Sequence, residues 1–218
     1  MTSTHDPERT LALSYARDAD RPALAALFAL DDALAALLRT TSEPAIAQIR
    51  LAWWREELAR LAPGTAPAMP VLAGLSEHVL PRGIDPVRLV QIVEGWEVLI
   101  EAQALDRNAL MMFAASRGGT LFAIGGDLLN VPVDPAAGEG WALSDLARHL
   151  ANVDEAAIAR QLAQDRLSVK RRWPRSARSL GAVAAIAAMD LALPPGAAPP
   201  IGSPKRVARL AWMRLTGR

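Results

Sequence analysis

Apolar residues in this chain recur at helical spacing, and this periodicity restricts its fold more than any other feature. Leucine and alanine follow one another at intervals of three and four residues, as in the stretch RPALAALFAL at residues 21–30. Such spacing places apolar side chains on one face of a helix. Runs in which β-branched or aromatic residues alternate with polar ones are nearly absent, so strands have little support. We expect an all-α protein.

Prolines, glycines and capping residues set the expected ends of the helices. Ser42-Glu43-Pro44 and Asp85-Pro86 each supply a capping side chain and a first-turn proline. Pro63-Gly64, Pro81-Arg82-Gly83 and Pro194-Pro195-Gly196 mark helix ends, because proline and glycine interrupt the helical backbone. The expected helices cover residues 8–17, 22–40, 44–61, 69–79, 85–104, 107–129, 139–152, 154–166, 176–191 and 203–216.

Length and apolar content favour one helical domain. The chain has 218 residues, of which 51% are apolar, enough for a sizeable core. We expect this domain to cover residues 1–193. Residues 194–218 form a connector rich in proline and glycine and a C-terminal amphipathic helix, which we expect to pack on the same domain.

Residue types absent from the chain exclude several kinds of site. There is no cysteine, which excludes disulfides, thiolate nucleophiles and cysteine metal sites. His5, His78 and His149 are not paired at ligand spacing, which argues against a structural zinc site. The first ten residues are polar, without a signal-peptide pattern, and the apolar run from Leu180 to Met189 is too short to cross a bilayer. We expect a cytoplasmic protein, with contact to a membrane surface left open.

Charge is divided unevenly along the chain. Residues 1–159 hold 12 arginines and 21 acidic residues, a net −9, whereas residues 160–218 hold 12 lysines and arginines and 2 acidic residues, a net +10. The basic part predicts either an anionic partner or docking onto the acidic body. Its densest run spans residues 166–178 and predicts an anion or membrane contact through Lys170, Arg171, Arg172, Trp173 and Arg175. A solvated loop is the competing interpretation. No nucleic acid is expected, since no recognition motif accompanies the run.

Two adjacent tryptophans in the helix at 44–61 must face different directions. Trp54 shares a stripe with Leu51, Leu58 and Leu61, which predicts a core position. Trp53 follows a stripe that begins apolar and ends charged. We favour a position for Trp53 at the edge of the core, and the alternative is that its ring forms part of the wall of a cavity.

Five segments of the chain resemble the squalene/phytoene synthase family in order and spacing. They are IRLAWWREEL at 49–58, RPALAALFAL at 21–30, VEGWEVLI at 93–100, FAASRGGTL at 113–121 and LSDLARH at 143–149. The resemblance spans roughly residues 14–167. It implies an isoprenoid-synthase fold, a helical bundle around a central cavity, shortened here at the C-terminal end. Active members condense two prenyl diphosphates head to head, with Mg²⁺ held by two aspartate-rich motifs.

The chain departs from the family pattern at the expected metal ligands. Where the family has its first acidic motif, this chain has Ala35, Ala36 and Arg39. Where it has its second, the chain has His149 and Val153, and a further family aspartate corresponds to Leu99. Mg²⁺ needs hard oxygen ligands to hold a departing diphosphate. The pattern therefore resembles more closely a non-catalytic branch that includes a mitochondrial assembly factor for respiratory complex I.

Three functions follow as hypotheses. The first is a non-catalytic protein that binds an isoprenoid or lipid, or assists assembly, without a cofactor. The second is an active prenyl transferase with Mg²⁺ at a shifted Asp31/Asp32 site, and the third is a helical scaffold that binds an anionic partner or membrane.

Further side chains are candidates for the wall of the cavity. Helical spacing and the resemblance single out Arg50, Trp53, Glu57, Glu94, Glu97, Asp145, Arg148 and His149. For the acidic residues a solvated helix face is the competing interpretation, and for Arg50 and Glu57 a surface row of ion pairs. Gly118 and Gly119 lack the spacing of a phosphate loop, and we expect them to allow close helix contact or to leave room for an apolar ligand.

Overall fold

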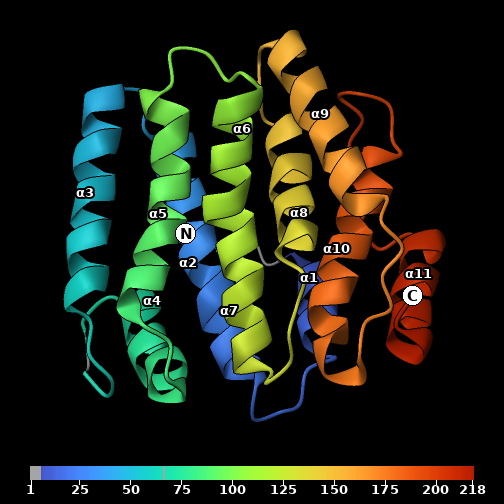
Figure 1. Ribbon diagram of the computed structural model, residues 1–218, viewed down its shortest axis with the longest axis horizontal. Helices are drawn as coiled ribbons and strands as arrows, with labels where there is room; N and C mark the ends of the chain where they lie inside the picture. The colour runs from blue at the N-terminus through green and yellow to red at the C-terminus, as the bar shows by residue number, and fades with distance from the viewer. Residues whose placement is uncertain (1–5, 66) are drawn as a thin grey trace.

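The computed structural model describes residues 6–65 and 67–218, so His5 and the start of the polar N-terminal segment lie outside it. Its regular elements in these ranges are all helical, which confirms the predicted fold class (Figure 1). The α-helices are α1 (Pro7–Leu13), α2 (Arg21–Thr40), α3 (Pro44–Arg60), α4 (Pro70–Gly74), α5 (Pro86–Glu101), α6 (Arg107–Phe113), α7 (Thr120–Leu128), α8 (Pro135–Ala147), α9 (Val153–Leu167), α10 (Arg178–Leu191) and α11 (Pro204–Thr216). Short π-helical and 3-10 segments join some of them. Over the described ranges, no helix combines the length and the apolarity that crossing a bilayer requires.

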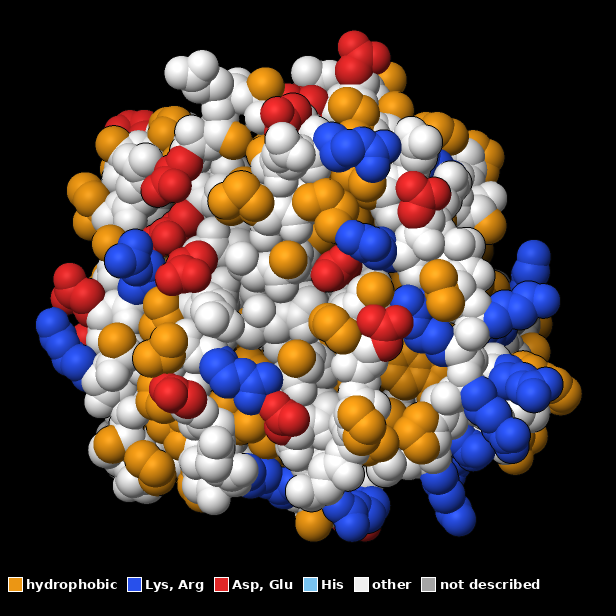
Figure 2. Space-filling view, viewed as in Figure 1, with side chains coloured by type: hydrophobic (Ala, Val, Ile, Leu, Met, Phe, Trp, Pro, Cys, Tyr) orange, Lys and Arg blue, Asp and Glu red, His pale blue; other side chains and the backbone are white. Residues whose placement is uncertain are grey.

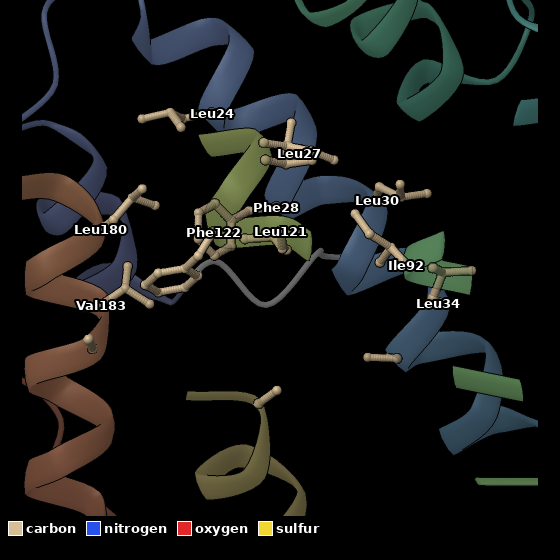
Figure 3. Close-up of a cluster of buried hydrophobic side chains, with 14 of the residues drawn as sticks. Leu24, Leu27, Phe28, Leu30, Leu34, Ile92, Leu121, Phe122, Leu180 and Val183 are labelled. Carbon is tan, nitrogen blue, oxygen red and sulfur yellow. The ribbon is translucent and has the colours of Figure 1, made fainter. Parts of the chain in front are cut away.

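Helix α2 runs through the core and contacts helices on both sides of the molecule. Its buried face carries Leu24, Leu27, Leu30 and Leu34, spaced by three and four residues. Figure 3 shows these side chains with those of α5, α7 and α10 that complete the cluster. Helix α3 packs on α5 at one end of the molecule, while α8, α9, α10 and α11 follow one another toward the other end (Figure 1). The central helices thus bring α2, α5 and α8 around one interior region.

Some predicted boundaries are wrong, and local capping explains the clearest case. Helix α8 begins at Pro135 rather than at 139, because the Asp134 side chain accepts a hydrogen bond from the Ala136 amide and Pro135 occupies the first turn. The same helix ends at Ala147, and α1 ends at Leu13 instead of residue 17. The remaining predicted helices lie close to their observed ranges.

The predicted helix at 107–129 contains a π-helical turn that the apolar pattern does not reveal. Residues Ala114–Gly119 form this turn between α6 and α7, and a second π-helical turn, Leu75–Val79, follows α4. A π turn inserts an extra residue into the helical repeat, and such turns are frequent at functional sites. The first of them carries Arg117, whose side chain forms the centre of the site described below.

Glycines allow neighbouring helices to approach the Ala114–Gly119 turn closely. A Cβ atom added at Gly118 would lie 2.1 Å from the Gly138 carbonyl oxygen of α8, and one added at Gly95 of α5 would lie 2.7 Å from the Arg117 amide nitrogen. Gly119 differs, since its nearest neighbour would be an ordinary contact at 3.5 Å with the Glu139 side chain. Gly118 therefore serves close helix contact, and Arg117 is held between α5 and α8.

Helix α11 packs against α10, and its position is fixed by polar contacts as well. Arg206 of α11 pairs with Glu8 of α1 at 2.6 Å and with Asp190 of α10 at 2.5 Å, and all three are buried. The Trp173 amide donates a hydrogen bond to the Gly217 carbonyl at 2.8 Å. Residues near the two ends of the chain are thus joined through one buried arginine.

The glycine contacts lead to a prediction about stability. Gly118→Ala should lower the free energy of unfolding by about 1–3 kcal/mol or more, because the added methyl meets backbone that cannot move aside. Gly119→Ala is the matched control and should be neutral or slightly stabilising, since alanine favours a helix and the site has room. Urea denaturation of both variants measures the difference, and equal stabilities would contradict the close contact.

Candidate functional site

A buried arginine joins two aspartates that come from different helices. Arg117 is 2% exposed. Its Nε and Nη2 atoms donate to Asp31 of α2 at 2.7 and 2.8 Å, and Nη2 also lies 2.9 Å from Asp145 Oδ2 of α8. The bidentate contact with Asp31 matches the planar guanidinium to a carboxylate. The space between these two carboxylates is therefore taken by a cation that belongs to the chain.

Two tryptophan rings enclose the guanidinium of Arg117. Its Cζ atom lies 4.1 Å from the ring centroid of Trp96 on α5 and 4.7 Å from that of Trp141 on α8. Trp96 also donates its indole N–H to Asp31 at 3.2 Å. Cation–π attraction is strongest where water is excluded. These rings stabilise the charge and keep it in one orientation.

Arg117 and Asp145 hold each other in their charged states. Burial by itself would lower the pKa of Arg117, but Asp31 and Asp145 outweigh burial and raise that pKa. Burial would likewise raise the pKa of Asp145, yet Arg117, His149 and Arg148 together hold it below the ordinary value. The guanidinium and the Asp145 carboxylate therefore stay charged at neutral pH.

The ion pairs continue from Asp145 toward the C-terminal helices. Arg148 lies 3.5 Å from Asp145 and 2.9 Å from Asp190, and Asp190 pairs with Arg206. Burial raises the pKa of Asp190 despite these two arginines. The result is a chain of alternating charges that runs from α2 through α8 and α10 to α11.

Two pockets lie on either side of Arg117. The smaller has a volume of about 120 Å³ and reaches Asp31, Asp145 and Asp190. The larger has a volume of about 430 Å³ and lies between α2, the start of α3, α5 and the end of α8. Its apolar wall consists of Ala35, Leu38, Pro44, Ala47, Trp96, Leu99, Ile100, Leu146 and Leu150. Its polar lining consists of Arg39, Thr41, Ser42, Arg117, Asp145 and His149.

One nitrogen of Arg117 has no partner within the described chain. Nη1 is buried and makes no hydrogen bond to another described residue, while Nε and Nη2 are bonded. Arg117 also lines both pockets, so its guanidinium borders each of them.

The arrangement does not suit a magnesium–diphosphate centre. Residues 6–65 and 67–218 contain no group of three or more histidine, aspartate or glutamate side chains that could hold a metal ion. Mg²⁺ demands oxygen ligands in octahedral geometry. Asp31 and Asp145 both contact Arg117, and the neighbouring Asp32, which also lines the smaller pocket, pairs with Arg9, whose Nη1 donates to it at 2.8 Å. The carboxylates of the proposed Asp31/Asp32 site are thus paired with different arginines.

The predicted cavity residues do not all meet at this site. Asp145 and His149 line the larger pocket, and Asp145 and Arg148 line the smaller one. His149 lies beside Asp145, its Nδ1 atom 2.8 Å from the Asp145 carbonyl oxygen. The candidates outside both pockets are Arg50, Trp53, Glu57, Glu94, Glu97, Gly118 and Gly119.

Most of these outer candidates make surface contacts on α3 and α5. Arg50 donates to Thr41, and Glu97 lies 3.3 Å from Arg55. Glu57 lies 3.8 Å from Arg60, and Glu94 is exposed.

The two adjacent tryptophans of α3 have different surroundings. Trp54 is buried along with Leu51 and Leu58, as the stripe predicts. Trp53 is 41% exposed, and its ring meets that of Trp54 edge to face at 5.4 Å. It packs at the edge of the core and borders neither central pocket.

The predicted basic run is only partly available to a partner. Trp173 is buried and lies against Gly181, where an added Cβ would come within 2.6 Å of its ring. Arg171 pairs with Asp134 at 2.8 Å. Lys170, Arg172 and Arg175 are exposed.

Arg117 and its tryptophans were not among the residues selected from the sequence. The available signal was an arginine between small residues, in Ala114-Ala115-Ser116-Arg117-Gly118-Gly119, within an otherwise apolar helix. A lone charge in such a segment has to find a buried partner. The partners, however, lie 86 and 28 positions away along the numbering, at Asp31 and Asp145, and only the fold brings them together.

The adjacent aspartates of α2 allow a matched test of this ion cluster. Asp31→Asn should lower the free energy of unfolding by about 3–5 kcal/mol, because it removes one carboxylate from a buried ionic group. Asp32→Asn changes the same atoms at a side chain that is 45% exposed and should cost less than about 1 kcal/mol. Urea denaturation at neutral pH compares the two. An equal loss of unfolding free energy in the two variants would contradict a stabilising ion pair between Arg117 and Asp31.

The lowered pKa of Asp145 predicts how stability depends on acidity. Since its folded-state pKa lies below the ordinary value of about 3.9, Asp145 stabilises the fold fully above that pH and loses this contribution as pH falls through the lowered pKa. Asp145→Asn should therefore be less stable at neutral pH, and its unfolding free energy should fall less steeply than that of the wild type from about pH 5 to about pH 2. Asp165→Asn, an exposed control on α9, should keep the wild-type slope. If the unfolding free energy of all three proteins fell equally steeply with pH, the lowered pKa of Asp145 would be contradicted.

Comparison with known protein families identifies the family of this chain. The family model described as squalene/phytoene synthase matches residues 2–164, about three quarters of the chain. No curated protein and no solved structure matches. The matched region includes Asp31, Arg117, Asp145 and both enclosing tryptophans. The chain belongs to the squalene/phytoene synthase family.

Proposed function

We propose that this chain is a non-catalytic member of its family that binds a single uncharged isoprenoid-type ligand and serves a binding or assembly role. One observation carries the proposal: the guanidinium of Arg117 lies between Asp31 and Asp145 within hydrogen-bond distance of both. Oxygen atoms that are engaged by a guanidinium are not free to coordinate Mg²⁺.

Opening this cluster to admit a metal is energetically unfavourable. Arg117 is enclosed by Trp96 and Trp141 and is almost fully buried, so a rotation away from Asp31 and Asp145 would separate buried charges. Breaking a buried ion pair costs about 3–5 kcal/mol. Without a metal, nothing in the cluster neutralises a departing diphosphate. Ionisation of a prenyl diphosphate is therefore not expected here.

The charge of the cluster favours a neutral ligand head. One arginine and two aspartates give Arg117, Asp31 and Asp145 a formal net charge of −1. A diphosphate placed in the larger pocket would lie beside the Asp145 carboxylate, with Arg39 and Arg117 as the cations of the lining. A hydroxyl or carbonyl oxygen could instead accept a hydrogen bond from Arg117 Nη1.

The size and lining of the larger pocket suit one apolar molecule. Its 430 Å³ lies near the lower end of the range of about 300–1,000 Å³ for small-molecule sites. Nine of its fifteen lining residues are apolar, and seven of these are leucine, isoleucine or alanine. Head-to-head condensation requires two prenyl chains side by side, for which this volume is small. A single isoprenoid alcohol or carbonyl compound is the ligand class that we propose.

The proposal predicts metal-independent binding of farnesol. Isothermal titration calorimetry should show the same affinity with and without Mg²⁺, and weaker binding of farnesyl diphosphate under both conditions. Leu99→Gln should weaken farnesol binding at least about tenfold, because an unpaired amide against an apolar chain costs about 1–3 kcal/mol. Val98→Gln is the matched control, because Val98 is the neighbouring, equally half-buried residue of α5 and lies outside the pocket.

A turnover assay completes the test of the proposed function. Radiolabelled farnesyl and geranylgeranyl diphosphates with Mg²⁺ should yield no condensed product. Product formation, or diphosphate binding that depends on Mg²⁺ and is abolished by Asp31→Asn with Asp32→Asn, would favour an active prenyl transferase. If Leu99→Gln and Val98→Gln weakened farnesol binding equally, binding in the larger pocket would be contradicted.

A further inference from the structure

A third pocket lies on the opposite face of α10 from the ion cluster. It has a volume of about 520 Å³ and lies between residues 167–173, α10 and α11. From α10 it receives Gly181, Ala184, Ala185 and Ala188, whereas Val183, Ile186, Ala187 and Asp190 face the smaller central pocket. This basic pocket, as we call it below, is therefore separate from the site proposed for the isoprenoid.

The basic pocket is lined by cations without a carboxylate among its described lining residues. Its charged members are Lys170, Arg171, Arg172, Arg209 and Arg218. Arg171 is paired with Asp134 outside the pocket. Of the other four, none forms an ion pair with an aspartate or glutamate side chain of the described residues. Arg209 is partly buried, which lowers its pKa, and its Nη1 donates only to the Arg218 carbonyl oxygen. Several positive charges thus face one opening over an apolar floor.

Large apolar side chains are also exposed on α11, outside the lining of the basic pocket. Trp212 is 57% exposed and Leu215 is 73% exposed. Arg209, Trp212 and Leu215 follow at intervals of three residues and are therefore neighbours along the helix surface. The buried face of α11 is a different one, formed by Arg206, Leu210 and Met213. In Figure 2 the blue side chains gather at the right edge, where α11 lies in Figure 1, while red side chains lie mostly elsewhere on this face.

This combination of groups matches an anionic bilayer. Headgroup phosphates attract lysine and arginine near the surface, and exposed tryptophan and leucine gain by entering the boundary between headgroups and acyl chains. A nucleic acid would satisfy the cations but would leave Leu215 without an apolar environment. Helix α11 joins both requirements on one surface, because Arg209 borders the basic pocket and Trp212 lies one turn away.

We propose that the outer face of α11 and the basic pocket form a docking surface for a phospholipid bilayer that contains anionic lipids. Phosphates of the headgroups contact Arg172 and Arg209, while Trp212 and Leu215 insert at the interface. The earlier assignment of membrane contact to the 166–178 run thereby changes, because Trp173 is in the core and Trp212 is the exposed aromatic residue beside the cations. This surface is independent of ligand binding beside Arg117.

Co-sedimentation with vesicles tests the surface. The wild-type protein should sediment with phosphatidylcholine vesicles that contain phosphatidylserine and remain in the supernatant with phosphatidylcholine alone. Arg172→Gln with Arg209→Gln should weaken the partition coefficient about 30-fold, since each cation near an anionic surface contributes roughly a factor of five to six. Arg50→Gln with Arg107→Gln is the charge-matched control and should leave binding within about twofold of wild type.

A second pair of variants tests the apolar contribution. Trp212→Ala with Leu215→Ser should reduce binding to anionic vesicles about tenfold or more. Trp53→Ala with Ile49→Ser removes another exposed tryptophan and aliphatic residue, on α3, and should leave binding unchanged. All four residues are exposed, so circular dichroism should show folded protein in every case.

Several outcomes would overturn the proposal. The first is that the wild-type protein does not bind anionic vesicles. The second is that the double variants on α11 and α3 lose vesicle binding equally, and the third is that the two double arginine variants do so. A wild-type dimer that dissociates in Trp212→Ala with Leu215→Ser, measured by sedimentation velocity without vesicles, would instead make α11 an interface between two copies of the chain. Binding that resists high salt and needs no phosphatidylserine would also contradict an electrostatic docking surface.

Discussion

The contact of one guanidinium with two aspartates organises the interior of this protein. Arg117 brings α2 and α8 together through Asp31 and Asp145, and α5 supplies the ring of Trp96 on one side. A buried charge is tolerated only when its partners satisfy it. The three helices must therefore keep their relative positions, and the carboxylates of Asp31 and Asp145 are both engaged by the guanidinium. The same contact thus supports the fold and is the basis of the proposed non-catalytic role.

Close packing around the π-helical turn makes this arrangement possible. Gly118 and Gly138 let α8 approach the turn, and Gly95 lets α5 lie against the backbone of Arg117. A side chain at any of these positions would separate the helices and lengthen the ion pairs. From Asp145 the charges continue through Arg148 and Asp190 to Arg206, so the C-terminal helix is coupled to the same interior. Helix α11 then leaves its outer face, with Trp212 and Leu215, available for an external surface.

The helical content and most helix positions follow from the sequence, because apolar spacing and proline placement are local signals. Trp54 could be assigned to the core from its stripe alone, and Trp53 to the edge. The π-helical turn could not be predicted, since its residues fit an ordinary helix equally well. The role of Arg117 also depends on partners far away in the chain. Helical spacing and the resemblance directed attention to Asp145, while Asp31 was selected as a metal ligand and not as the partner of an arginine.

The central claim is that the guanidinium of Arg117 lies between Asp31 and Asp145, so that these carboxylates are not free to bind a metal ion. A crystal structure grown with Mn²⁺ and a non-hydrolysable farnesyl diphosphate analogue tests it most directly, through an anomalous difference map. We expect no manganese peak near Asp31 or Asp145, and the guanidinium of Arg117 should remain between them. A manganese ion bound by these aspartates, with Arg117 turned away, would contradict the account.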